Sequence, residues 1–104
     1  DIDWNCSNLS FEQGVILPDD CSRLFSYCTC LKSIDLTNLD TSNVTDISAM
    51  YRDCYNIESG ALALYQQVST QTNPPSNHSR TFYNCGSNTT TGAAELAQIP
   101  SDWK

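Results

Sequence analysis

The sequence predicts an α/β solenoid, that is, a short right-handed stack of small strands and short helical turns closed by C-terminal capping helices. The stretch Leu24–Leu31 is echoed by Met50–Ile57. Both contain, in order, an apolar residue, an aromatic residue, two variable residues, Cys, two variable residues and an apolar residue. Self-similarity at a period of about 20–50 residues is typical of stacked repeats, in which each repeat buries its apolar face against its neighbours.

The length of 104 residues indicates one domain. We expect a single repeat domain over 1–104, with repeat coils over 1–57. Residues 58–104 are expected to form a degenerate coil and a helical C-terminal cap, because a stack of repeats needs its last apolar face covered.

The net charge of −7, from twelve acidic and five basic residues, argues against a nucleic-acid partner. A nucleic-acid binder needs clustered basic side chains, and the five basic residues are scattered along this chain. No apolar run approaches the roughly 20 residues of a membrane span, so no membrane insertion is expected. Charged residues make up only 16% of the chain, and the abundant Ser, Thr and Asn are typical of extracellular modules. We expect an extracellular, cell-surface or virion-surface location, and a fragment of a longer chain.

A strand is expected at Leu31–Leu36, which has the L-x-x-L-x-L form of a leucine-rich-repeat strand. Leu31, Ile34 and Leu36 would point into the core. A loop follows over Thr37–Asn43, which is rich in turn-forming residues. Thr45 then favours the N-cap of a short helical turn that continues through Tyr51.

Beyond Ile57 the repeat degrades and helical periodicity takes over. The segment Ala61–Val68 carries apolar residues at helical offsets and predicts a helix of about three turns. Residues 73–76, Asn-Pro-Pro-Ser, end it. Thr81–Cys85 restarts a partial coil, and Gly92–Ile99 predicts a second helix that ends before Pro100. Trp103 is expected to pack near the end of the cap.

The six cysteines fit the repeat better than they fit a chemical site. Four of them occupy one column of the repeat, and a small apolar side chain suits a buried column. We expect these four to be buried free thiols, with Cys21 also buried because it aligns with Ile47. The alternative is one disulfide between neighbouring coils, or between Cys30 and a nearby cysteine. The four cysteines of the column are Cys6, Cys28, Cys54 and Cys85.

Metal, cofactor and catalytic sites find little support in the sequence. Cys28-x-Cys30 has a one-residue spacer, without a second pair and with only His78 as an imidazole ligand, which does not fit zinc. The Asp-Thr-Ser-Asn run at 40–43 lacks the alternating carboxylates and closing Glu of a calcium loop. Asp19 and Asp20 are better explained by a helix start. We therefore expect no metal, no cofactor and no enzymatic activity.

Candidate partner-binding residues are solvent-facing strand positions and aromatic residues at variable positions of the repeat. Exposed aromatic side chains commonly anchor interfaces. Tyr51, in the same column as Phe25, is expected to be core instead. The candidates are Lys32, Ser33, Asp35, Tyr27 and Tyr55.

The stretch from Leu31 to Tyr51, with Leu-x-x-Ile-Asp-Leu followed by Asp-Thr-Ser-Asn-Val-Thr-Asp and a Met-aromatic pair, resembles the BspA-like leucine-rich repeat of bacterial surface proteins. The resemblance is strong over 17–57 and weaker over 1–16 and 78–86. It implies a secreted, cell-wall or virion-surface protein that adheres to host or bacterial partners, without catalysis.

Two functions follow from the sequence. The first is a non-enzymatic surface recognition or adhesion module of a larger bacterial or phage-like surface protein, which binds a protein or glycan on a host or bacterial surface. The alternative is a purely structural C-terminal capping segment of a leucine-rich-repeat array.

Overall fold

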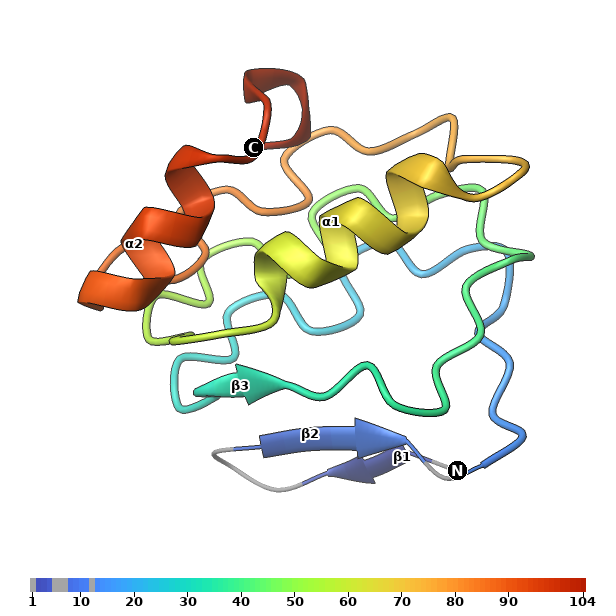
Figure 1. The fold of residues 1–104 in the computed structure, drawn as a ribbon, viewed down its shortest axis with the longest axis horizontal. Helices are drawn as coiled ribbons and strands as arrows, with labels where there is room; N and C mark the ends of the chain where they lie inside the picture. Colours follow the sequence, from blue (N-terminus) through green and yellow to red (C-terminus); the bar gives the residue numbers. More distant parts are fainter. Residues whose placement is uncertain (1, 5–7, 12) are drawn as a thin grey trace.

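The computed structural model describes residues 2–4, 8–11 and 13–104, which contain three short strands and two α-helices (Figure 1). Strand β1 (Ile2–Trp4) runs antiparallel to β2 (Asn8–Phe11), and β2 runs parallel to β3 (Ser33–Ile34). Helices α1 (Ala61–Thr70) and α2 (Thr90–Ala97) follow, and a 3-10 turn covers Ser101–Trp103. The two helices therefore lie where the sequence predicts them.

Three segments of consecutive turns, 21–28, 47–54 and 78–85, lie side by side and are here named the turn segments. Within the first, the amide of Cys28 donates to the carbonyl of Phe25, while the amide of Phe25 donates to Met50 of the second segment at 2.9 Å. In the second, Tyr51 donates to Thr81 of the third, also at 2.9 Å. Bonds within a segment thus alternate with bonds to the next segment, which satisfies the backbone donors of a stretch without regular secondary structure.

The prediction of a short helical turn from Thr45 to Tyr51 is wrong. Ala49 adopts a left-handed backbone with φ of 56°, and an α-helix requires successive right-handed residues. Left-handed residues recur at matching positions of all three turn segments, with φ between 56° and 63°. Such a backbone is uncommon outside glycine, so its threefold recurrence identifies it as part of the repeated structure. The residues are Arg23, Ala49 and Arg80, and four positions later Tyr27, Asp53 and Asn84.

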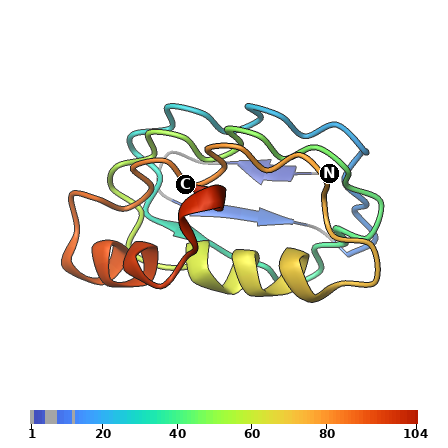
Figure 2. The ribbon, with the colours of Figure 1, turned by 90° about the horizontal axis from the view of Figure 1, so that it is seen from above.

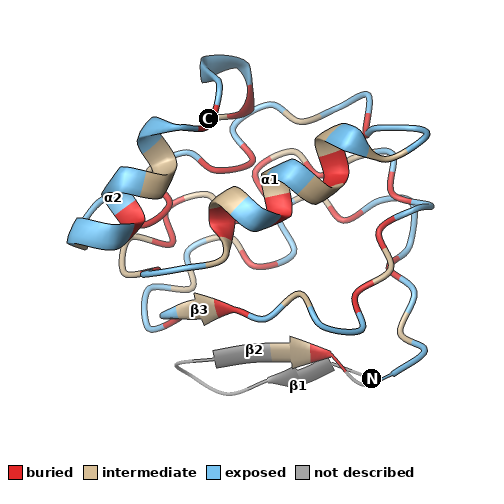
Figure 3. Cartoon of the chain, in the orientation of Figure 1, coloured by how far each residue is buried: buried red, intermediate tan, exposed pale blue. Residues whose placement is uncertain are grey.

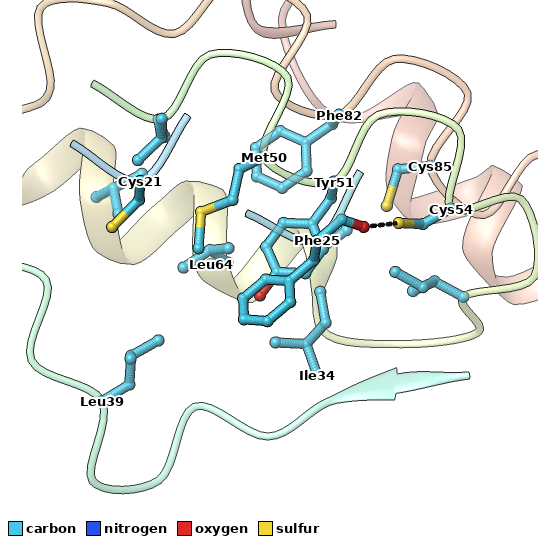
Figure 4. Close-up of a cluster of buried hydrophobic side chains, with 14 of the residues drawn as sticks. Cys21, Phe25, Ile34, Leu39, Met50, Tyr51, Cys54, Leu64, Phe82 and Cys85 are labelled. Atoms are coloured by element: carbon cyan, nitrogen blue, oxygen red, sulfur yellow. Dashed lines mark hydrogen bonds between the residues drawn. The ribbon is translucent and has the colours of Figure 1, made fainter. Parts of the chain in front are cut away.

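The core lies between the turn segments and the helices, which occupy opposite sides of the molecule (Figure 2). One aromatic side chain from each turn segment enters it. The rings of Phe25 and Tyr51 stack with centres 5.3 Å apart, and those of Tyr51 and Phe82 with centres 6.4 Å apart (Figure 4). Leu64 and Val68 of α1 are buried on the helix side. The aromatic column predicted from the repeat is therefore present.

The C-terminal residues close the third turn segment. The amide of Phe82 donates to the carbonyl of Trp103 at 2.9 Å, in place of a further turn segment. The indole of Trp103 lies parallel to the His78 ring, with centres 3.8 Å apart, and meets Tyr65 of α1 edge-on. Trp103 is buried as expected.

The predicted α/β solenoid is wrong. The described residues form a compact globule with extents of 31 × 29 × 19 Å, instead of coils that each alternate a strand with a helical turn. Of the predicted strand Leu31–Leu36, only Ser33–Ile34 is regular, because the Asp35 carboxylate accepts the Thr37 amide at 2.9 Å and turns the chain. After Ser59 the chain enters α1 instead of a longer strand.

Candidate partner-binding surface

Four side chains from the three turn segments stack on the surface, and we name them the Tyr–Arg ladder: Tyr27, Arg52, Tyr83 and Arg80. The Arg52 guanidinium lies 5.9 Å from the centre of the Tyr27 ring and 5.5 Å from that of Tyr83. The Arg80 guanidinium lies 5.6 Å from the centre of Tyr83. Each distance is within the range of a cation–π contact. The ladder thus links side chains from all three repeats.

The backbone register between turn segments places these side chains together. The Tyr27 amide donates to the Arg52 carbonyl at 2.8 Å, and the Asp53 amide donates to the Tyr83 carbonyl at 2.7 Å. Because neighbouring hydrogen-bonded chains lie only about 4.8 Å apart, side chains at matching positions of successive segments meet on one surface. The contacts of the ladder are therefore a consequence of the repeat.

The buried Asp53 carboxylate fixes Arg52, which lies between the two tyrosines of the ladder. Its carboxylate accepts a bond from Arg52 Nε at 3.3 Å and from Asn84 Nδ2 at 3.1 Å, and it also hydrogen-bonds Tyr55. Burial acts to raise the pKa of Asp53, but the hydrogen bonds from Asn84, Tyr55 and Arg52 outweigh it and leave the pKa below its ordinary value. The Asp53 carboxylate is accordingly ionised at neutral pH and fixes the guanidinium of Arg52 between the two tyrosines.

Tyr55 joins the same cluster. Desolvation by burial and the nearby Asp53 carboxylate raise its pKa, and Tyr27 and Tyr83 add to the effect. A phenol with a raised pKa stays protonated and remains a hydrogen-bond donor. The half-buried Tyr55 is therefore a neighbour of the ladder that supports Asp53.

A shallow groove of about 530 Å³ shares Tyr83 with the ladder and is also lined by Asn84, which bonds Asp53. Its other wall comes from α2, which is largely exposed (Figure 3). The Thr89 hydroxyl caps α2 by accepting the Gly92 amide at 2.9 Å. At the far end, Lys104 Nζ donates to the Leu96 carbonyl at 2.8 Å. The residues that line the groove are Tyr83, Asn84, Ala93, Leu96, Ala97, Ser101 and Lys104.

Glycine sets the distance between α2 and the third turn segment. A Cβ at Gly92 would collide with the Ile57 carbonyl oxygen and lie 2.8 Å from the Gly86 Cα, directly after the third turn segment. A Cβ at Gly86 would lie 2.6 Å from the same Ile57 oxygen. Gly86 also has a positive φ of 76°. Both residues must lack a side chain for α2 to lie close enough to form the groove wall.

The candidates from the sequence divide into two groups. Tyr27 is 59% exposed in the ladder and Tyr55 lies beside it. Lys32, Ser33 and Asp35 instead lie on or next to β3, where Lys32 and Asp35 are exposed and Ser33 is half-buried between β2 and a parallel bridge to Ser59. The structure thus brings only the two tyrosines together.

Arg52, Tyr83 and Arg80 were missed as candidates. The repeat spacing could have identified Tyr83, because Tyr83 follows Phe82 just as Arg52 follows Tyr51. Tyr83 is 39% exposed. Extending the aromatic register into the third turn segment would have placed Tyr83 next to Arg52.

The thiols of the described cysteines lie mainly in the core. Cys54 and Cys85 are buried free thiols and Cys21 is buried, as expected, whereas Cys28 is free but only half-buried. Cys54 Sγ donates to the Phe25 carbonyl at 3.0 Å (Figure 4). Burial raises the pKa of Cys21 to about 11 and that of Cys54 to about 12. Such thiols are weak nucleophiles at neutral pH.

Two cysteines differ from the free thiols of the core. Cys30 is disulfide-bonded, as the alternative reading allowed, and Cys6 lies outside the described residues. Among the residues that the structure describes, no three His, Cys, Asp or Glu side chains gather as metal ligands.

Comparison with known proteins gives no significant match to a family model, a curated protein or a solved structure. Across residues 2–4, 8–11 and 13–104, no helix is long and apolar enough to cross a membrane.

Proposed function

We propose that the chain is a non-enzymatic recognition module of a larger bacterial or phage-like surface protein. It binds a protein or glycan on a host or bacterial surface through the Tyr–Arg ladder. The observation that carries the proposal is the exposed stack of Tyr27, Arg52 and Tyr83 across three repeats. Tyrosine and arginine are the residue types that most often dominate binding energy at interfaces, together with tryptophan.

The organisation of the ladder supports a role in binding. The guanidinium of Arg52 is held by Asp53 and by two aromatic rings, so little side-chain freedom remains to be lost when a partner binds. Tyr27 nevertheless keeps more than half of its surface exposed. A rigid and accessible aromatic surface is well suited to recognition.

The surface location is part of the proposal. The resemblance of residues 17–57 to BspA-like repeats supports it, and so does the low charged fraction of 16%.

The non-enzymatic character is also part of the proposal. The raised pKa values of the Cys21 and Cys54 thiols favour a structural over a catalytic role for these residues.

Binding of the purified chain to immobilised matrix proteins and a glycan array tests this function. We expect a ligand whose affinity falls more than tenfold in Tyr27→Ala and Arg52→Ala, a loss of about 1.4 kcal/mol or more. Lys32→Ala and Asp35→Ala serve as exposed controls next to β3 and should stay within about twofold of the wild type. A ligand that is lost in the β3 variants and retained in the ladder variants would contradict the proposal.

A further inference from the structure

We propose that the groove between α2 and the third turn segment binds an acidic peptide segment of a partner protein, with one apolar side chain of that segment as its anchor. This inference rests on the proposed recognition function and names the class of partner. The groove and the ladder meet at Tyr83, which lines the groove and also contacts Arg52 and Arg80.

The groove is apolar where α2 forms it and polar at its ends. Ala93, Leu96 and Ala97 supply the apolar wall, and Ser101 and Lys104 lie at one end. Its volume of about 530 Å³ falls in the range of roughly 300–1,000 Å³ that is usual for ligand sites. An apolar centre with a polar rim is the usual organisation of a protein–protein contact.

The charge on the rim points to the sign of the partner. The whole chain carries a net charge of −7 and only five basic residues, yet Arg80, Arg52 and Lys104 all border the groove or the ladder. The carboxylate closest to the ladder, Asp53, is already bonded to Arg52 and Asn84. Asp53 offsets Arg52, Glu95 of α2 accepts the Leu62 amide, and the exposed Asp102 lies between Ser101 and Lys104 in the sequence. The rim therefore keeps two cations, Arg80 and Lys104, against the carboxylate of Asp102, and this small positive excess on an otherwise acidic molecule is complementary to an acidic segment.

A peptide bound there would be held by its side chains. Several amides of the third turn segment are already used, since Tyr83 donates to Arg80, Cys85 donates to Phe82, and Phe82 donates to Trp103. Only part of this backbone is thus open to pairing with an extended strand, so side-chain contacts carry most of the binding. An apolar anchor in the groove, with carboxylates that reach the guanidinium of Arg80 and the ammonium of Lys104, satisfies both chemistries.

Titration of the ¹⁵N-labelled chain with synthetic peptides tests this inference. The probes are Glu-Glu-Leu-Glu-Glu, the same peptide with Gly for Leu, and Lys-Lys-Leu-Lys-Lys. We expect the first to shift the amides of Tyr83, Ala93 and Ala97, with affinity that falls as salt is raised. The other two should bind at least tenfold more weakly.

Two pairs of matched variants locate the site. Arg80→Glu and Ala97→Trp should each weaken binding of the acidic peptide about tenfold or more. Lys32→Glu makes the same charge change beside β3, and Ala63→Trp adds the same side chain at an exposed position of α1; both should bind like the wild type. Equal weakening by Lys32→Glu and Arg80→Glu would overturn the inference, because it would indicate attraction without a site.

The remaining outcomes separate this inference from the proposed function. Equal binding of the Leu and Gly peptides would overturn the anchor, and absence of binding by the acidic peptide at millimolar concentration would overturn the inference as a whole. A hyaluronan oligosaccharide serves as the acidic glycan probe. If it alone shifts the amides of Tyr83 and Arg52, the peptide inference fails while the recognition function stands.

Discussion

The guanidinium of Arg52 lies 5.5 Å from the centre of the Tyr83 ring, although the two residues belong to different repeats of the sequence. They meet because the Asp53 amide bonds the Tyr83 carbonyl and holds the second and third turn segments in register. The same register stacks Tyr51 on Phe82 inside the core. One alignment of the backbone therefore produces an aromatic column on the inside and the Tyr–Arg ladder on the outside.

Replacement of Tyr51 by Phe is expected to leave stability unchanged or to raise it by about 1 kcal/mol. Among the described residues, the Tyr51 hydroxyl is the buried side-chain polar atom without a hydrogen-bond partner, and an unsatisfied buried donor costs about 1–3 kcal/mol. Phenylalanine already occupies the same column at positions 25 and 82. Urea unfolding measures the change. Tyr51→Ala serves as control and should lose about 3–5 kcal/mol, whereas a loss above 1 kcal/mol in Tyr51→Phe would contradict the burial described.

Gly86 and Gly92 should be far less tolerant of alanine than Gly14. A Cβ at either of the first two would collide with the Ile57 carbonyl oxygen, whereas a Cβ at Gly14 has nothing within 4 Å. Gly14 has a positive φ of 88°, so Gly14→Ala isolates the cost of the backbone conformation, about 1–2 kcal/mol. We expect Gly92→Ala to cost more than Gly14→Ala by about 2 kcal/mol or more in thermal or urea unfolding. Equal costs would indicate that α2 does not pack as closely as described.

Asp53→Asn should destabilise the chain by about 1–3 kcal/mol at pH 7, because a charged acceptor of three side chains is lost. The folded state lowers the pKa of Asp53, so the stabilisation is fully present above the ordinary pKa of 3.8. It is lost as the pH falls through the lower, folded value. The difference in unfolding free energy between wild type and Asp53→Asn should therefore shrink from about pH 5 downwards.

The control for this pH dependence is Asp102→Asn, which removes one charge from the exposed C-terminal turn. Its free energy of unfolding should parallel that of the wild type across the same pH range. A difference between wild type and Asp53→Asn that stays constant down to pH 2 would contradict the lowered pKa of Asp53.

The thiols should differ in reactivity according to burial. Cys28 is partly exposed, whereas Cys54 and Cys85 are fully buried. Burial raises the pKa of both buried thiols, that of Cys54 to about 12. Brief alkylation at pH 8 followed by peptide mass spectrometry should label Cys28 first and label Cys54 and Cys85 only after denaturation. Labelling of Cys54 as fast as Cys28 in the native chain would show that the column is open to solvent.

The sequence predicted the parts of the structure that depend on periodicity. The aromatic column of Phe25, Tyr51 and Phe82, the burial of Cys21 and Cys54, and both helices follow from repeat spacing and apolar pattern. Backbone conformation did not follow in the same way. Arg23 and Ala49 adopt left-handed φ values that their residue types do not favour, because hydrogen bonds to the neighbouring segments fix them. The predicted α/β solenoid was wrong because the sequence pattern does not reveal these backbone conformations.

The candidate site was predicted only in part. Tyr27 and Tyr55 were identified because exposed aromatics are good binding residues, and both lie in or beside the ladder. Asp35 was also expected to face a partner; it is exposed, and its carboxylate accepts the Thr37 amide and forms a turn. Arg52 and Tyr83 depend on contacts between repeats, and such contacts need the register of the backbone as well as the sequence.

The Tyr–Arg ladder is common to the proposed function and to the peptide-binding groove, and its existence can be tested without a partner. The measurement is the NMR chemical shift of the Arg52 side-chain protons, which the ring currents of Tyr27 and Tyr83 should move upfield. We predict that Tyr83→Leu returns these shifts most of the way towards random-coil values, whereas Tyr65→Leu, which removes a ring packed on Trp103 instead, leaves them unchanged. Random-coil shifts for Arg52 in the wild-type chain, or no response to Tyr83→Leu, would contradict the ladder and the recognition surface built on it.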